Sequence, residues 1–140
     1  MISAAARDRV IFAAALALGV LGWAWAGGRE AWDFPLYGAL VLPVTYLALF
    51  FFGLLGSRGA WRWPALAFGA QLATLLLLRA VKGQGPGNLA PLGLLIFGAL
   101  ATIGLAPAYL GVALRRWRQK RRAARFAAEA RRAAFSASDS

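Results

Sequence analysis

The stretch that decides the fold is "LAPLGLLIFGALATIGLAPAYLGVALRRWRQKRRAAR", residues 89–125. Residues 89–114 carry no charged side chain, and a dense run of Arg and Lys begins at the next position without a linker. A helix needs about 20 apolar residues to cross a hydrocarbon core of roughly 30 Å. This run therefore predicts a membrane-spanning helix that emerges from the bilayer directly into a basic tail.

The rest of the chain repeats the apolar pattern. Of 140 residues, 61% are hydrophobic and 15% are charged, whereas about 25% of the residues in a typical soluble domain are charged. Further apolar runs occupy 10–26, 36–55 and 61–78, and turn-forming or charged residues separate them. We therefore expect an all-α fold: an integral membrane four-helix bundle over 1–114, followed by a basic C-terminal cytoplasmic helix within 115–140.

Two features modify this expectation. "AWA" at 24–26 resembles a signal-peptidase site, but the length of the first run and the three runs after it favour an uncleaved anchor. Pro43 and Pro107 lie inside the second and fourth runs, so we expect kinks there, with threonine side chains or neighbouring helices satisfying the freed carbonyls.

The basic residues predict the orientation, because Arg and Lys stay on the cytoplasmic side during insertion. Arg29, Arg79 and Lys82 fall on one side of the expected membrane. The other side receives all nine basic residues of 115–140 together with Arg7, Arg9, Arg58 and Arg62. We therefore predict a multi-pass protein of the bacterial inner (plasma) membrane, with both termini cytoplasmic and 27–35 and 82–88 as outer loops.

The basic tail predicts binding to an anion. Its nearest anion is the inner leaflet, whose anionic lipids attract each adjacent Lys or Arg by about 1 kcal/mol. A seam of Trp117, Ala124, Ala128 and Phe135 on a helical wheel also allows docking on the acidic face of a protein. Nucleic acid is the least supported partner, since no nucleic-acid-binding motif is present. The candidate lipid- or partner-binding residues are Arg115, Arg116, Trp117, Arg118, Lys120, Arg121, Arg122 and Arg125.

Small and polar residues inside the runs predict helix packing. Small residues at spacing four let helices approach closely, and they occur at Ala65–Gly69–Ala73, Ala15–Gly19 and Gly104–Ala108. We expect Ala65, Gly69 and Ala73 to form the tight internal contact, and the first and fourth helices to face a partner or lipid. Gln71 and Thr74 mark a face of the third helix that forms an interhelical hydrogen bond or, with Thr102, lines a solute path.

The chain has few of the residues that cofactor, metal or catalytic sites require. There is no Cys or His, and the single Met is residue 1, so we expect no bound cofactor and no metal. The five carboxylates lie in flanks, loops and the tail, and we expect no enzymatic activity. The glycine-rich segment at 79–93 suggests a small anion-binding loop formed by Arg79, Lys82, Gly83 and Gly85, although a plain turn uses the same residues.

We therefore expect a non-catalytic accessory or assembly subunit of a larger bacterial inner-membrane complex, for example respiratory or photosynthetic, whose partners are membrane lipids and other integral membrane subunits. With "RD" before the first run and "GPG" at 85–87, the chain resembles the four-helix small membrane subunits that accompany a larger permease in tripartite secondary transporters. That resemblance implies the first alternative, a small transporter or a transporter's membrane subunit. The second alternative is a membrane tether that recruits a cytoplasmic partner through the basic tail.

Overall fold

The computed structural model describes residues 3–25, 36–57, 59–83 and 90–138, and these residues are helical apart from short connections. The elements are α1 (Ala4–Trp25), η2 (Tyr37–Val41), α2 (Leu42–Leu55), α3 (Arg62–Val81) and α4 (Ala90–Ser138). No strand occurs within the described ranges. The expected all-α fold is confirmed at this level.

Three helical stretches are long and apolar enough to cross a membrane: Tyr37–Leu55, Arg62–Val81 and Gly93–Ala130. They correspond to the second, third and fourth apolar runs of the sequence. The first run lies in α1, which is not among these three, so a fourth crossing stays a prediction.

Helix α1 begins six residues before the apolar run that predicted it. Ser3 precedes the helix, and its hydroxyl oxygen accepts a 3.1 Å hydrogen bond from the backbone N–H of Ala6. This is the bond made by a helix N-cap, where a side-chain oxygen satisfies one of the first four N–H groups. The alanines and arginines that follow are strong helix formers, so the helix starts at its cap and not at its first apolar residue.

The two interior prolines have different effects. Pro43 follows the π-helical turn η2, in which the backbone N–H of Leu42 donates to the carbonyl of Tyr37. A wider turn at this point relieves the clash that a proline ring makes with the carbonyl four residues earlier. Pro107 is accommodated inside α4, which continues through it.

Of the two expected ways to satisfy the carbonyls freed by these prolines, the threonine side chains are not used, and contact with neighbouring helices stays a prediction. Thr45 and Thr102 each donate to the carbonyl four residues earlier, which belongs to Val41 and Gly98 respectively. Neither carbonyl lies four residues before a proline, so neither is one that a proline leaves unbonded. Each threonine hydroxyl therefore finds a hydrogen-bond acceptor inside its own apolar helix. Neither hydroxyl bonds to a carbonyl that a proline has left without a donor.

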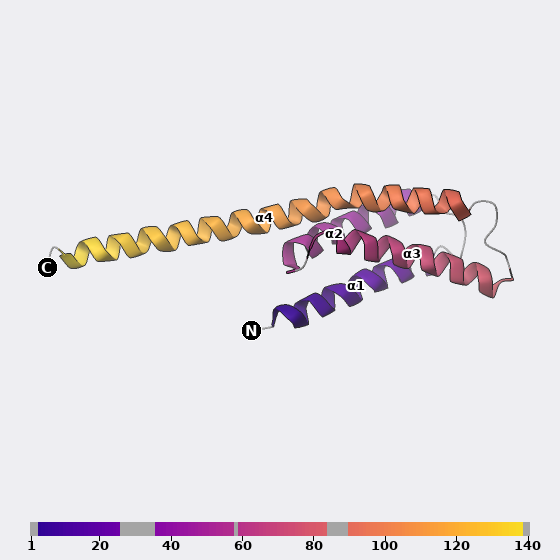
Figure 1. Cartoon of the computed structure of the whole chain (residues 1–140), viewed down its shortest axis with the longest axis horizontal. Coiled ribbons are helices and arrows are strands. Elements are labelled where there is room, and N and C mark those ends of the chain that lie inside the picture. The colour runs from indigo at the N-terminus through magenta and orange to yellow at the C-terminus, as the bar shows by residue number, and fades with distance from the viewer. Residues whose placement is uncertain (1–2, 26–35, 58, 84–89, 139–140) are drawn as a thin grey trace.

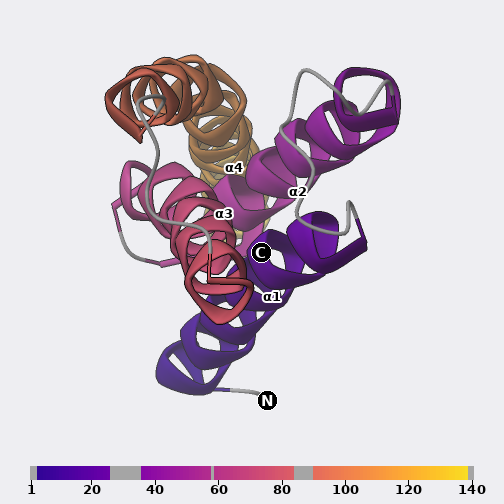
Figure 2. The ribbon, with the colours of Figure 1, turned by 90° about the vertical axis from the view of Figure 1, so that its right-hand side faces the viewer.

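The helices form a bundle from which one helix projects. α4 packs chiefly on α2, α1 packs on α3, and α3 joins the two pairs by contacting α4. Figure 2 looks along the bundle and shows the four helices around a common centre, with α1 opposite α4. Figure 1 shows that α1 starts, α2 ends and α3 starts at the same end of the bundle, and that α4 runs beyond the other helices there. We call this end the basic end.

Glycines allow the closest helix contacts. A Cβ atom added to Gly53 of α2 would overlap the carbonyl of Ala108, and one added to Gly111 of α4 would overlap the carbonyl of Phe50. Between α1 and α3, a Cβ on Gly19 would lie 2.7 Å from the carbonyl oxygen of Ala67. Small residues therefore bring backbones together in both helix pairs, as they do in membrane bundles.

The internal contact of α3 is not the one expected from the sequence. Ala65, Gly69 and Ala73 are exposed, and a Cβ added to Gly69 would meet no atom within 4 Å. The inward face carries Ala67 and Phe68, which are almost fully buried. The prediction of a tight internal contact through Ala65, Gly69 and Ala73 is therefore wrong for this chain.

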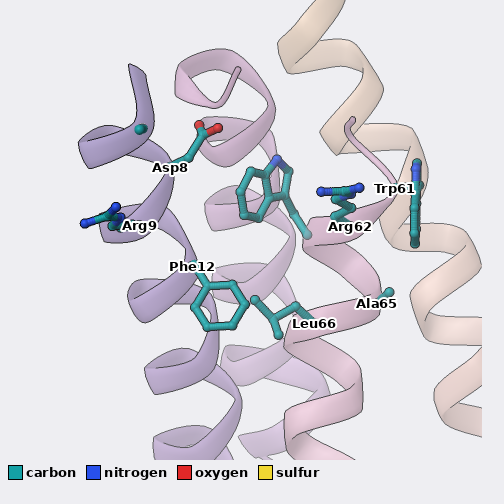
Figure 3. Close-up of a pocket in the computed structure, with 9 residues that line it drawn as sticks. Asp8, Arg9, Phe12, Trp61, Arg62, Ala65 and Leu66 are labelled. Atoms are coloured by element: carbon teal, nitrogen blue, oxygen red, sulfur yellow. The ribbon is translucent and has the colours of Figure 1, made fainter. Parts of the chain in front are cut away.

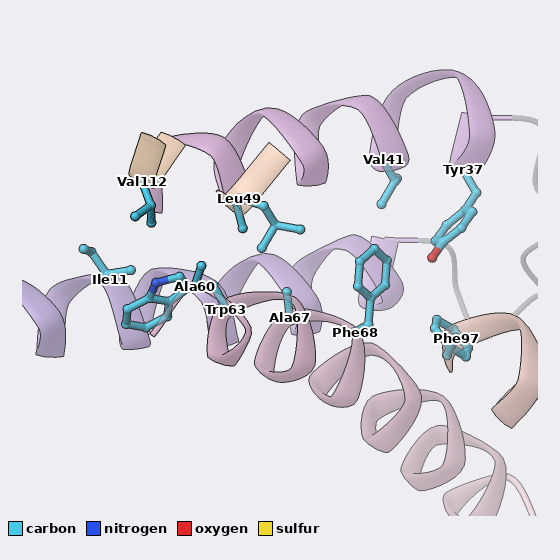
Figure 4. Close-up of a cluster of buried hydrophobic side chains, with 11 residues drawn as sticks. Ile11, Tyr37, Val41, Leu49, Ala60, Trp63, Ala67, Phe68, Phe97 and Val112 are labelled. Carbon is cyan, nitrogen blue, oxygen red and sulfur yellow. The ribbon is translucent and has the colours of Figure 1, made fainter. Parts of the chain in front are cut away.

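The other two small-residue pairs do face inward. Ala15 and Gly19 of α1 are buried, and so are Gly104 and Ala108 of α4. The first and fourth helices therefore contribute directly to the bundle, contrary to the expectation that they face outward. Figure 4 shows the core, to which all four helices contribute side chains and in which Leu49 of α2 and Phe68 of α3 are completely or almost completely buried.

Candidate functional site

The most prominent feature outside the bundle is the last part of α4, residues 115–138, which we call the basic arm. It continues the helix that begins at Ala90 with no break at the expected domain boundary of 114 and 115. At 1.5 Å per residue the arm is about 35 Å long, and Figure 1 shows it extending along the axis of the bundle and away from the other helices. All side chains from Arg116 to Ala130 are exposed.

The arm has two chemically different faces. Successive residues turn by about 100° around a helix, which places Arg118, Arg121, Arg122 and Arg125 within about one third of its circumference. The other side carries Ala123, Ala127 and Ala130 together with Phe126, which is 69% exposed. Ala124 and Ala128 of the predicted seam lie next to Ala127 on the wheel and extend this apolar side. From Arg121 to Ala130 the arm is therefore amphipathic, with a charged side that also carries Glu129. Nearer its start, Arg116 and Lys120 lie on the side that is apolar farther out.

Trp117 is held near the start of the arm by a neighbouring cation. The guanidinium carbon of Arg121 lies 3.9 Å from the centre of the Trp117 ring. A cation over the face of Trp is attracted by the ring's quadrupole. The contact uses one face of the indole, so Trp117 is less available to an apolar seam than the sequence pattern indicates.

The base of the arm borders the end of α2. Arg115, Arg118, Gln119 and Arg122 line a hollow of about 300 Å³ together with Leu54 and Leu55. Three of the predicted lipid- or partner-binding arginines thus share one site beside apolar side chains. A similar hollow, lined partly by Arg116, Trp117 and Lys120, lies on another side of α4. Arg125 lies farther out along the helix.

Gln71, Thr74 and Thr102, which the sequence suggested as the lining of a solute path, make separate hydrogen bonds in the described structure. The Tyr37 hydroxyl donates a 2.6 Å hydrogen bond to Oε1 of Gln71, which is completely buried. Thr74 instead donates to the carbonyl of Ala70, four residues earlier in its own helix. Thr102 is exposed and also bonds within its own helix. Of these residues, Gln71 makes the interhelical contact that the sequence suggested.

The expected anion loop is only partly described. Gly83 has a φ of 67°, a conformation that glycine adopts easily, and its N–H donates to the carbonyl of Ala80. Arg79 is half-buried and Lys82 is exposed at the same helix end. Gly85 lies outside the described residues. The geometry is that of a helix-terminating turn, and anion binding there stays a prediction.

Sequence reasoning missed Asp8. This residue of α1 is only 5% exposed, and its carboxylate accepts hydrogen bonds from both the backbone N–H of Ser57, at 2.9 Å, and the Ser57 hydroxyl. The bonds connect the start of α1 to the turn after α2. In the sequence, Asp8 is a single acidic residue between Arg7 and Arg9, and a count of net charge does not distinguish it from them.

No group of three or more metal-ligating side chains occurs among the described residues. Comparison with protein-family models, curated proteins and solved structures gives no match to this chain. The geometry of the bundle and of the basic arm is therefore the basis on which a function can be proposed.

Proposed function

We propose that the chain is a membrane-embedded tether whose basic arm recruits a soluble, acidic protein at the cytoplasmic surface. One observation carries the proposal: α4 continues from an apolar segment into an exposed cationic helix without a break. A continuous helix transmits the position of the bundle to the end of the arm, whereas a flexible tail would not. The excess of basic residues at the basic end supports its cytoplasmic location.

Lipid attraction explains only the base of the arm. Arg115, Arg116 and Arg118 adjoin the end of the apolar segment, where a leaflet surface would lie. Arg125 is ten positions beyond Arg115, which corresponds to about 15 Å at 1.5 Å per residue. Electrostatic attraction is screened over about 8 Å at physiological ionic strength. A straight arm therefore carries its outer charges beyond the reach of the leaflet.

An acidic protein groove fits both faces of the arm. Nucleic acid would use the arginines but would leave Phe126 and the alanines beside it exposed to water. Amphipathic basic helices bind proteins by placing their apolar side in a groove while acidic residues at its rim contact the cations. Exposed Phe126, between Arg122 and Glu129 on the chain, is the natural anchor of such a contact.

Site-specific photo-cross-linking in cells tests this function. A benzophenone side chain replaces Phe126 in one variant and Phe51, an exposed residue of α2, in a matched control. We expect the Phe126 probe to cross-link a soluble protein of net negative charge. The same probe in a chain that also carries Arg118→Gln, Arg121→Gln and Arg125→Gln should not give that product. Cross-links to lipid alone, to nucleic acid, or to the same protein regardless of the arginines would contradict the proposal.

A second candidate function is assembly into a larger membrane complex. It is favoured by the outward face of α3, where Ala65, Gly69 and Ala73 leave room for another helix to approach closely. Gly69→Leu would block that approach, whereas Gly98→Leu changes an equally open glycine of α4. We expect only Gly69→Leu to release the chain from its complex in mild detergent, as measured by native mass spectrometry. Equal behaviour of the two variants would remove this candidate.

A further inference from the structure

A separate cavity of about 460 Å³ lies between α1 and α3 at the basic end. Its described lining comes from the first turns of α1 and from the start of α3, so it does not belong to the arm. The residues that surround it are Ala5, Asp8, Arg9, Phe12, Trp61, Arg62, Trp63, Ala65 and Leu66.

The lining changes from polar to apolar along the helices. Figure 3 shows Asp8, Arg9 and Arg62 on one level, with Phe12 and Leu66 farther along α1 and α3. The polar level is nearer the helix starts, where a headgroup layer would lie if α3 crosses the membrane, and the apolar level is nearer the hydrocarbon. A molecule that fills this cavity must have the same polarity, with a charged head and an apolar chain.

The polar level suits a phosphate group. Arg9 of α1 and Arg62 of α3 stand on opposite sides of the cavity, with Asp8 between them (Figure 3). The two guanidinium groups outnumber the single carboxylate of Asp8, so the lining carries a net positive charge. Guanidinium groups donate paired hydrogen bonds to phosphate oxygens.

Two tryptophans line the cavity, and one of them contacts a guanidinium group. The guanidinium carbon of Arg62 lies 5.5 Å from the centre of the Trp61 ring, within the distance at which the ring's quadrupole attracts a cation. Trp63 is 3% exposed, and its indole Nε1–H has no hydrogen-bond partner among the described residues. That nitrogen is itself buried beside Gly56, where an added Cβ would lie 3.1 Å from it, so it faces the helix core and is not offered to a molecule in the cavity.

From this arrangement we infer that the cavity is a specific site for one phospholipid molecule, whose phosphodiester binds Arg9 and Arg62 and whose acyl chain lies along Phe12 and Leu66. The site holds a single lipid between two helices and is distinct from the general attraction of the basic arm to a charged leaflet. It does not depend on the tether function.

Lipid titration of the full-length, delipidated protein in detergent tests the inference, with bound lipid measured by native mass spectrometry. The probe is dioleoylphosphatidylglycerol, and dioleoylglycerol, which has the same chains and no phosphate, is the control ligand. We expect saturable binding of one phospholipid. Arg62→Gln should weaken it by about tenfold or more, the effect of losing a charge-assisted hydrogen bond. Arg125→Gln, which removes an equal charge from the arm, should leave it unchanged.

Cavity-filling variants provide the second arm of the test. Leu66→Trp occupies the apolar level and should also lower affinity by about tenfold, while Leu77→Trp, on an exposed part of the same helix, should not. If Leu66→Trp fails to fold, Ala5→Phe fills the cavity from α1. Equal binding of dioleoylglycerol, displacement by inorganic phosphate alone, or undiminished binding to both the Arg62 variant and a folded cavity-filling variant would overturn the inference.

Discussion

The Tyr37 hydroxyl donates a 2.6 Å hydrogen bond to Oε1 of Gln71 and so connects the π-helical turn before α2 to the middle of α3. Both residues are buried. An amide in an apolar interior is costly without a partner, and this bond supplies one to the side-chain oxygen. The pair also fixes how far α2 can rotate against α3.

Tyr37→Phe should destabilise the bundle by about 1 kcal/mol, the usual strength of an interhelical hydrogen bond within a membrane. Gln71→Leu removes the amide itself, and the double variant should therefore lose less stability than the two single variants together. Unfolding in mixed detergent micelles measures the free energy of unfolding of four purified proteins: the unchanged chain, the two single variants and the double variant. Additive losses would show that the two side chains do not interact.

The contact between Asp8 and Ser57 makes a second prediction. Asp8→Ala leaves the Ser57 N–H and hydroxyl without their acceptor, and should cost about 2 kcal/mol or more because the bonds to a charged group are the stronger kind. Ser57→Ala retains the backbone bond and should cost less. Glu129→Ala, which removes an exposed carboxylate from the arm, is the matched control. Thermal unfolding followed by circular dichroism ranks the three variants, and an equal Tm for Asp8→Ala and Glu129→Ala would contradict the prediction.

The glycine contacts predict opposite effects of one chemical change. Gly53→Ala places a methyl group against the Ala108 carbonyl of α4 and should separate α2 from α4, with a loss of about 2 kcal/mol or more. Gly98→Ala adds the same methyl group where no atom lies within 4 Å, and alanine favours helix by up to about 1 kcal/mol over glycine. The same unfolding measurement compares them, and similar values for both variants would refute the α2–α4 contact.

These contacts also show which parts of the fold the sequence could predict. Apolar length is a local property, so the runs at 36–55, 61–78 and 89–114 predicted three helices close to where they occur. The inward face of α3 is different, because a helix that is apolar on every side has no periodic signal to mark it. Shape decides the matter instead: Gly19 of α1 fits against Ala67 and Ala70, and Gly69 therefore turns outward.

The candidate sites were predicted less completely for a related reason. The density of Arg after residue 114 predicts the basic arm, and the composition of the arm predicts that it is helical. The burial of Asp8 depends on Ser57, 49 positions away in sequence, and the cavity between α1 and α3 depends on the same arrangement. Contacts of this range follow only from the packing of the helices.

Absence of native cysteine makes a direct test of orientation possible. Val81 lies at the end of α3 opposite the basic end, and Ala130 lies on the arm; both are exposed. If basic residues hold the arm in the cytoplasm, a membrane-impermeant maleimide should label Val81→Cys in intact cells and Ala130→Cys only after permeabilisation. The reverse pattern would place the arm outside and would remove the proposed recruitment of a cytoplasmic protein.

The rigidity of the arm can be measured as a distance. Spin labels on Leu55→Cys, beside Arg115 at the end of α2, and on Ala130→Cys are separated by an axial rise of about 22 Å if the helix is continuous. We expect a single narrow distribution by double electron–electron resonance. Ala123→Pro should broaden it, because proline interrupts a helix interior at a cost of about 3 kcal/mol, while Ala123→Leu should preserve it. A distribution that is already broad without proline would mean that the arm cannot hold a partner at a fixed distance from the membrane.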